Sequence, residues 1–246
     1  RIDAVHLFWC FLFPALGGLL YGYDIGATAM VLDSLQSADT SGTTWYGVLA
    51  AHPLLVGLLT SMVTVGAVAG SALILRVEHS LGRRGELAVA GCLYVTGALG
   101  EYAATSAWSL GLARGVYGVG VGFAMHGAPT YIAETAPARL RGALVSGKEA
   151  MIVGGMLLGY AVGARCRDKT GGWRVAFVMA APIALVMLAG TLLILPRSPR
   201  WLALRGQKND AKKVMRFVLP DLTDAEFAAL DAESTETTTP EEGDDD

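Results

Sequence analysis

Two charged side chains lie inside long apolar stretches of the sequence, and one of them, an aspartate, could bind and release a proton there. Asp24 is the single charge of the stretch 7–30, and Arg114 lies in the stretch 110–132. An ionisable group at membrane depth costs about 2.5 to 3.5 kcal/mol on insertion scales, so it usually faces a water-filled cavity or a partner charge. Desolvation raises the proton affinity of a carboxylate and a nearby arginine lowers it, so a movable arginine would make Asp24 a proton carrier. The alternative is an aspartate near a helix end that reaches the lipid headgroups.

The composition is that of a membrane protein. Hydrophobic residues make up 53% of the chain and charged residues 17%, which favours a membrane protein over a soluble domain. About six apolar stretches are long enough to cross a bilayer, at 7–30, 53–75, 87–104, 110–132, 144–164 and 175–195. The predicted fold class is therefore an all-α membrane protein, since a spanning segment must satisfy its own backbone hydrogen bonds.

The chain changes character after residue 196, and we predict three parts. Residues 1–196 form the six-span membrane unit. Residues 197–230 are predicted to form short cytoplasmic amphipathic helices, with Asn209 as a cap and a capping box of Thr223 and Glu226. Residues 231–246 are acidic and rich in threonine, with almost nothing to bury, so we expect a disordered tail. Arg1 is not an initiator methionine, and we expect it to be the edge of a fragment.

The positions of lysine and arginine predict the orientation. With the N-terminus on the cytoplasmic side, most basic residues of the connections fall on that side. The opposite side receives Arg165, Arg167, Lys169 and Arg174. An even number of spans then returns the C-terminal part to the cytoplasmic side.

Several function classes find no support in the sequence. Cys10, Cys92 and Cys166 are isolated and fit neither a metal motif nor a disulfide framework. There is no metal-ligand cluster, phosphate loop or nucleophile elbow. We therefore expect no enzyme activity, no catalytic or metal-binding residues, no cofactor and no nucleic-acid partner.

Short motifs occur in a fixed order over nearly the whole chain: Tyr21-Gly22-Tyr23-Asp24, Gly82-Arg83-Arg84, Arg114-Gly115, Pro129-Thr130-Tyr131-Ile132-Ala133-Glu134, Arg141-Gly142, Gly172-Trp173-Arg174 and Pro196-Arg197-Ser198-Pro199-Arg200. Together they resemble the sugar porters of the major facilitator superfamily. Met125-His126 and Lys148-Glu149 are similar to plant and algal proteins described as D-xylose/proton symporter-like, several of them plastidial.

The resemblance implies half a transporter. Family members have about twelve spans in two halves with the substrate site between them, so the chain is expected to be the N-terminal six-helix half with short cytoplasmic helices. Its partners would be a monosaccharide, a proton, the lipid bilayer, and the missing C-terminal six-helix half, in the same full-length chain or a separate one. The implied function is transport of a hexose or pentose by alternating access, coupled to proton symport. The location is integral and multi-pass, in the plasma membrane, the vacuolar membrane or the plastid envelope.

Two other functions stay open. One is a facilitative sugar uniporter, in which Asp24 and Arg114 are structural only. The other is a non-transporting, half-length membrane sensor or scaffold.

The resemblance also implies roles for individual residues. Asp24 and Arg114 would form the proton-coupling pair, which protonation releases; a static buried ion pair is the alternative. Glu149 stands where many sugar porters have a glutamine that binds sugar hydroxyls, and a carboxylate only accepts hydrogen bonds while ionised. Substrate binding is therefore assigned to Glu149, with Tyr23 and His126, although His126 could equally be a satisfied core histidine.

A network of charges at the cytoplasmic ends of the spans is the last implied site. Its members are expected to be Arg83, Arg84, Glu134, Arg141 and Arg200. The family's acidic residue before Gly-Arg-Arg is His79 here, which predicts a weaker or pH-sensitive network unless Glu78 substitutes. Arg197 likewise replaces a family glutamate. The glycine pairs Gly111/Gly115 and Gly118/Gly122 are predicted to let another helix approach closely.

Overall fold

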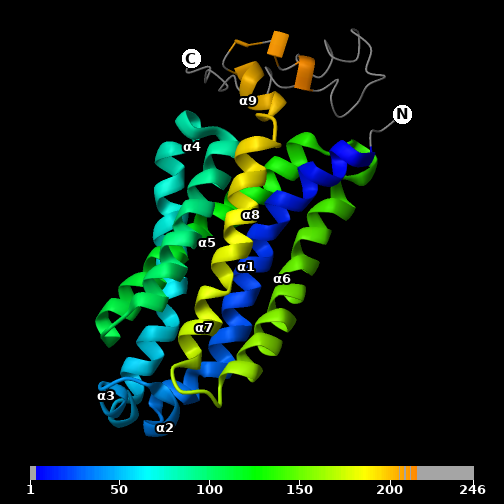
Figure 1. Cartoon of the computed structure of the whole chain (residues 1–246). Helices are drawn as coiled ribbons and strands as arrows, with labels where there is room; N and C mark the ends of the chain where they lie inside the picture. Colours follow the sequence, from blue (N-terminus) through cyan, green and yellow to red (C-terminus); the bar gives the residue numbers. More distant parts are fainter. Residues whose placement is uncertain (1–3, 205, 208, 211, 215–246) are drawn as a thin grey trace, which may run out of the picture.

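The computed structural model describes residues 4–204, 206, 207, 209, 210 and 212–214, and its regular elements there are all helices. Their order is α1 (Ala4–Gln36), α2 (Ala38–Ser41), α3 (Tyr46–Ala51), α4 (Pro53–Ala103), α5 (Ala107–Thr135), α6 (Ala138–Cys166), α7 (Gly172–Val178), α8 (Ala180–Leu193) and α9 (Pro199–Leu204). The long helices lie alongside one another in a bundle, and α1 begins at the same end at which α9 lies (Figure 1). The chain therefore crosses the bundle an even number of times, as predicted.

A helix is present at each of the six predicted spans. The second and third both lie within α4, and the sixth is divided between α7 and α8. Three stretches are long and apolar enough to cross a bilayer by length and composition, namely Val5–Gln36, Pro53–Glu78 and Gly172–Leu193. The helices of the remaining spans carry more glycine and more charge, which lowers their hydropathy without shortening them.

The 51-residue helix α4 is two helices joined at one residue. Gly82 has φ 66° and ψ 165°, a left-handed conformation that favours glycine. The chain reverses direction there, so the two halves of α4 run up and down the bundle (Figure 1). A Cβ atom at Gly82 would also lie 2.8 Å from the indole ring of Trp201.

Glycines allow two helix pairs to pack with their backbones almost in contact. A Cβ at Gly22 of α1 would lie 1.9 Å from the carbonyl oxygen of Ile152 in α6, and one at Gly155 of α6 would lie 2.1 Å from that of Leu19. In α5, a Cβ at Gly118 would lie 2.1 Å from the carbonyl oxygen of Val63. The predicted role of the α5 glycines is thus confirmed at Gly118, and α1 and α6 use the same device.

The interior of the bundle is aromatic and the outside is apolar. Tyr94 and Tyr117 are fully buried and donate hydrogen bonds to the carbonyl oxygens of Gly17 (3.1 Å) and Leu20 (2.9 Å). Large apolar side chains are exposed on the outer surface, among them Leu54 (77%) and Leu193 (84%). Exposed apolar side chains along the length of the helices suit a lipid environment.

Short helices lie in the connections at both ends of the bundle. The polar segment between the first two spans contains the short helices α2 and α3, and α2 is joined to the α6–α7 turn by a 2.8 Å hydrogen bond from Gly171 N to Thr40 O. At the other end, α9 begins the segment predicted to form cytoplasmic helices. The capping box of Thr223 and Glu226 and the acidic tail lie outside the described residues.

Candidate functional site

Asp24 and Arg114 meet inside the bundle. Asp24 lies two-thirds of the way along α1, and Arg114 is the eighth residue of α5, in its third turn. The two guanidinium nitrogens Nη1 and Nη2 donate to Oδ1 and Oδ2 of Asp24, each over 3.3 Å. Asp24 is 5% exposed and Arg114 2%. A bidentate contact of this kind is stronger than a single hydrogen bond between an arginine and a carboxylate. The predicted contact between the two side chains is therefore present.

Further contacts fix the Arg114 guanidinium in place. Its Nε donates to the carbonyl oxygen of Leu59 over 2.9 Å, and its Nη2 donates to Thr28 Oγ1 over 3.1 Å. The guanidinium carbon lies 5.1 Å from the centre of the Phe177 ring, a cation–π arrangement. Helices α1, α4, α5 and α7 therefore all contribute to one buried site.

A second carboxylate shares this site, and the sequence analysis missed it. Glu101, near the end of α4, is 1% exposed, and its Oε1 lies 3.8 Å from Nη1 of Arg114. That distance is an ion-pair distance but too long for a hydrogen bond, and Oε1 has no hydrogen-bond partner among the residues that the structure describes. The signal was available, because Glu101 is an acidic residue within the predicted span 87–104, as Asp24 is within 7–30.

Tyr23 lies beside this site but faces the protein interior. Its side chain is 1% exposed, and its hydroxyl donates to the carbonyl oxygen of Ala176 in α7. The hydroxyl therefore links α1 to α7.

Glu149 lies on α6, away from Asp24 and Arg114, and points out of the bundle. Its side chain is 62% exposed, and its Oε1 lies 2.7 Å from Nζ of Lys148. Lys148 is itself buried, with 4% of its surface exposed, and its Nζ also lies 3.9 Å from the sulfur of Met125. The exposed carboxylate is thus oriented by a buried ammonium group.

Arg83 is the centre of a charge network at the α9 end of the bundle. It binds Glu86 (2.9 Å), Glu78 (3.2 Å) and Glu134 (3.4 Å). Burial lowers the pKa of Arg83, but the carboxylates of Glu134 and Glu86 raise it more, so its guanidinium stays charged. Glu78 is therefore one of the acids of this network, whereas the side chain of His79 lies outside the described part.

The other predicted members take different places. Arg84 donates to the carbonyl oxygen of Thr191 over 3.1 Å, which ties the second half of α4 to α8. Arg141 is exposed and makes no ion pair within the described part of the chain. The guanidinium carbon of Arg197 lies 5.5 Å from the centre of the Trp201 ring. The side chain of Arg200 lies outside the described residues.

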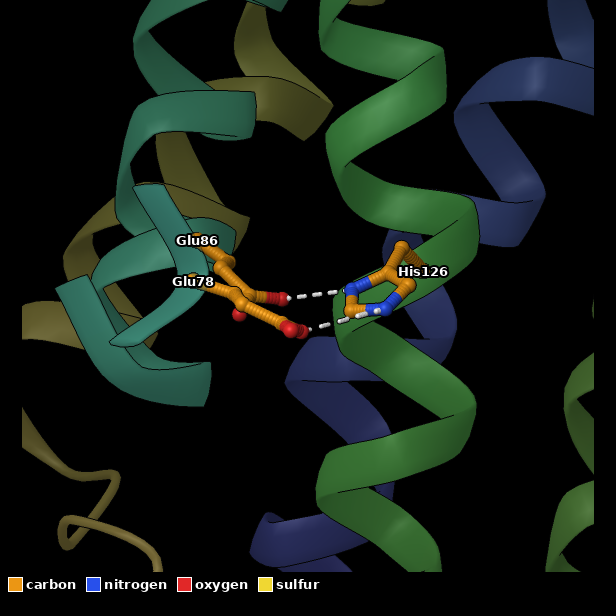
Figure 2. Close-up of side chains that lie close together, drawn as sticks. All are labelled: Glu78, Glu86 and His126. Atoms are coloured by element: carbon orange, nitrogen blue, oxygen red, sulfur yellow. Dashed lines mark hydrogen bonds and ion pairs between the residues drawn. The ribbon is translucent and has the colours of Figure 1, made fainter. Parts of the chain in front are cut away.

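Figure 2 shows how His126 of α5 joins this network. Its Nδ1 lies 3.0 Å from Oε2 of Glu86, and its Nε2 lies 3.7 Å from Oε2 of Glu78. The three side chains bring metal-ligand atoms within 4.8 Å of one another. However, the Arg83 guanidinium already binds both carboxylates, and a divalent ion would have to compete with that charge. The arrangement therefore suits a histidine held by carboxylates better than it suits a metal site.

The comparisons with known proteins agree with this geometry. The sequence model of the family described as "Sugar (and other) transporter" matches residues 10–242. "D-xylose-proton symporter-like 3, chloroplastic" of Arabidopsis thaliana is 47% identical over 217 residues, which cover 86% of this chain and 38% of that protein. The "D-xylose transporter" of Levilactobacillus brevis is 35% identical over 206 residues, covering 83% of this chain and 42% of that protein.

Solved structures show the same fold. The major facilitator superfamily proton:xylose symporter XylE, bound to 6-bromo-6-deoxy-D-glucose, matches with a TM-score of 0.82 at 28% identity, over 96% of this chain and 54% of that one. A partially occluded, inward-open XylE from E. coli also gives 0.82, at 29% identity. The chain thus spans about half of these transporters. It corresponds to the N-terminal half of these transporters, and it is an integral, multi-pass membrane protein that belongs to the sugar transporter family of the major facilitator superfamily.

Proposed function

We propose that the chain is one half of a transporter that moves a monosaccharide together with a proton by alternating access. The Asp24–Arg114 contact is the observation that carries this proposal. Both groups are almost completely buried and come from different helices. A buried ion pair often stabilises a protein no more than apolar residues of the same size would. Stability alone therefore does not account for this pair, which favours a functional role.

The contact suggests how a proton would be coupled to movement. While Asp24 is ionised, its two 3.3 Å hydrogen bonds hold α1 against α5. Protonation removes the charge of the carboxylate and weakens both bonds, so the two helices would become free to separate. Release of the proton on the other side of the membrane would restore the contact.

The substrate class follows from the relatives and from one exposed side chain. The relatives' names specify D-xylose, which supports a pentose or hexose here. Of the residues assigned to sugar binding, Glu149 has an exposed carboxylate, paired with Lys148. Tyr23 is hydrogen-bonded to Ala176, and His126 is paired with Glu86. We therefore assign Glu149 the leading role in binding sugar hydroxyls. The name of one relative includes the word chloroplastic, which favours the plastid envelope among the candidate membranes.

We further propose the division made from the sequence, with a membrane unit at 1–196, a cytoplasmic segment at 197–230 and an acidic tail at 231–246. The other six-helix half would come from the same full-length chain or from a partner. A uniporter would need neither proton binding by Asp24 nor release of Arg114.

Transport by the full-length product of the gene in proteoliposomes tests the proposal. Labelled D-xylose would be offered with an imposed pH gradient to the wild type and to Asp24→Asn, which resembles the protonated aspartate in shape but cannot ionise. We expect the variant to lose uphill accumulation and to retain exchange of sugar for sugar. Its level in the membrane must be measured too, because Arg114 loses the carboxylate that accepts both of its Nη hydrogen bonds. Equal pH-driven accumulation by both proteins would exclude Asp24 as the proton carrier and point to a different proton site, whereas accumulation by neither would leave facilitated diffusion.

A further inference from the structure

Two carboxyl groups and one guanidinium group share the buried site around Arg114. Asp24 takes both Nη donors of Arg114, whereas Glu101 approaches Nη1 at 3.8 Å and has an Oε1 without a hydrogen-bond partner. With both carboxyl groups ionised, the site would hold one uncompensated negative charge at 1% exposure. A buried, uncompensated charge is strongly unfavourable in a protein.

The surrounding helices offer no second positive charge to Glu101. From α1 the site receives Tyr23 and Asp24, from α5 Arg114 and Tyr117, and from α7 the ring of Phe177. Arg174 of α7 is directed elsewhere, since it donates to the carbonyl oxygen of Tyr102 and lies over the Trp173 ring. Within the described part of the chain, Arg114 is the one basic group within 4.0 Å of Glu101.

We propose that Glu101 is a second proton-binding group of this site and carries a proton while Asp24 is ionised and bound to Arg114. A proton from water converts the Glu101 carboxylate to the neutral acid, and the site then holds one negative and one positive charge. Such a proton explains why Oε1 tolerates burial without a partner, because a neutral carboxyl group loses far less solvation than a carboxylate.

The same geometry suggests an exchange between the two acids. When Asp24 takes up a proton, Glu101 is the remaining carboxyl neighbour of Arg114. Its Oε1 lies 3.8 Å from Nη1, compared with 3.3 Å between Oδ2 of Asp24 and Nη2. Glu101 could then lose its proton and bind the guanidinium in place of Asp24. Arg114 would never be without a counter-ion. This exchange rests on the proposed function, whereas proton binding by Glu101 does not.

Infrared spectroscopy of the chain in lipid bilayers at neutral pH tests proton binding without any transport. A protonated carboxyl group gives a carbonyl stretching band that an ionised one lacks. Selective isotope labelling of the glutamate side-chain carboxyls shifts the band if a glutamate carries the proton, and leaves it in place if an aspartate does. We expect the band to shift in the labelled wild type and to be lost in Glu101→Gln.

Two further variants sharpen the test. Glu86→Gln is the matched control, because Glu86 is also a fully buried glutamate of α4 but is bound to Arg83 and His126; the band should remain. In Asp24→Asn the band should disappear, because Glu101 becomes the sole carboxylate for Arg114 and ionises.

The labelled wild type decides the question even if a variant fails to fold. An unshifted band would place the proton on an aspartate, and the absence of any band would mean that both acids are ionised; either result overturns the proposal. A band that persists in Asp24→Asn would overturn the exchange. If the wild type showed no pH-driven accumulation in the proteoliposome experiment while the labelled band was intact, the transport proposal alone would be refuted.

Discussion

Arg114 Nε donates a 2.9 Å hydrogen bond to the carbonyl oxygen of Leu59, on the first half of α4. This bond does not depend on Asp24, so protonation of Asp24 leaves the guanidinium attached to α4. Arg114 therefore acts as a fixed point that α1 can leave and rejoin.

Replacement of Arg114 by lysine tests this arrangement. The ammonium group keeps the charge, but one nitrogen cannot reach Leu59, Thr28 and both oxygens of Asp24 together. A hydrogen bond to a charged group contributes about 1.5 to 3 kcal/mol, so we expect pH-driven sugar accumulation in proteoliposomes to fall about tenfold or more. Arg165→Lys, at an exposed position of α6, is the control. Full accumulation by Arg114→Lys would mean that charge alone is sufficient.

Adjacent glycines of α6 should differ sharply in their tolerance of a methyl group. A Cβ at Gly155 would lie 2.1 Å from the carbonyl oxygen of Leu19, whereas a Cβ at Gly154 meets nothing within 4 Å. We expect Gly155→Ala to destabilise the protein by about 1 to 3 kcal/mol through overpacking. Gly154→Ala should be neutral or stabilising by up to about 1 kcal/mol, since alanine favours helices. Thermal unfolding of the purified chain in bilayers or micelles measures both, and equal midpoints would contradict the close packing of α1 on α6.

Removal of Arg83 should be more harmful than removal of the acid it binds. Arg83→Ala leaves Glu86, which is fully buried, without its 2.9 Å cation, and breaking a buried pair from one side costs about 3 to 5 kcal/mol. Adding Glu86→Gln removes the stranded charge, so the double variant should recover much of that loss. Denaturant unfolding of the three variants and the wild type provides the cycle. A double variant no more stable than Arg83→Ala would show that burial of Glu86 is not the cause.

Glu149→Gln should change sugar affinity and leave proton coupling intact. Glutamine both donates and accepts hydrogen bonds, whereas the ionised glutamate only accepts. One hydrogen bond gained or lost corresponds to roughly 1 kcal/mol, so we expect KM for a given monosaccharide to change about fivefold. Lys148→Met is the control for loss of the 2.7 Å ion pair. Unchanged KM values across a set of pentoses and hexoses would exclude Glu149 from the sugar site.

The sequence predicted the elements well because membrane spans have a strong, local signal. Apolar length located the six helical regions. The cost of burying a charge marked Asp24 as a group that needs a partner or water, and the resemblance to the sugar porters implied that its partner is Arg114, 90 residues away. The glycine pairs also predicted close helix packing, since small residues four apart form one face of a helix.

The burial of Glu101 could be predicted from its place in an apolar span, but its contact with Arg114 and the contacts of His126 could not. Glu101 reaches Arg114 because of how α4 packs against α5, and no spacing in the sequence reports that. His126 lies beside Glu78 and Glu86 because α4 reverses at Gly82 and brings both acids to one point of α5. The sequence therefore predicts either a sugar-binding or a core histidine at position 126, and it gives no sign of the contact with Glu86.

The reversal at Gly82 also bears on how the bundle moves. One non-helical residue joins the two halves of α4, so the second and third spans have almost no slack between them. Rigid segments joined this closely move together in a hinge or shear motion. The Trp201 ring packs on Gly82. We therefore expect a tilt of either half of α4 to move α9, the helix that follows the last span.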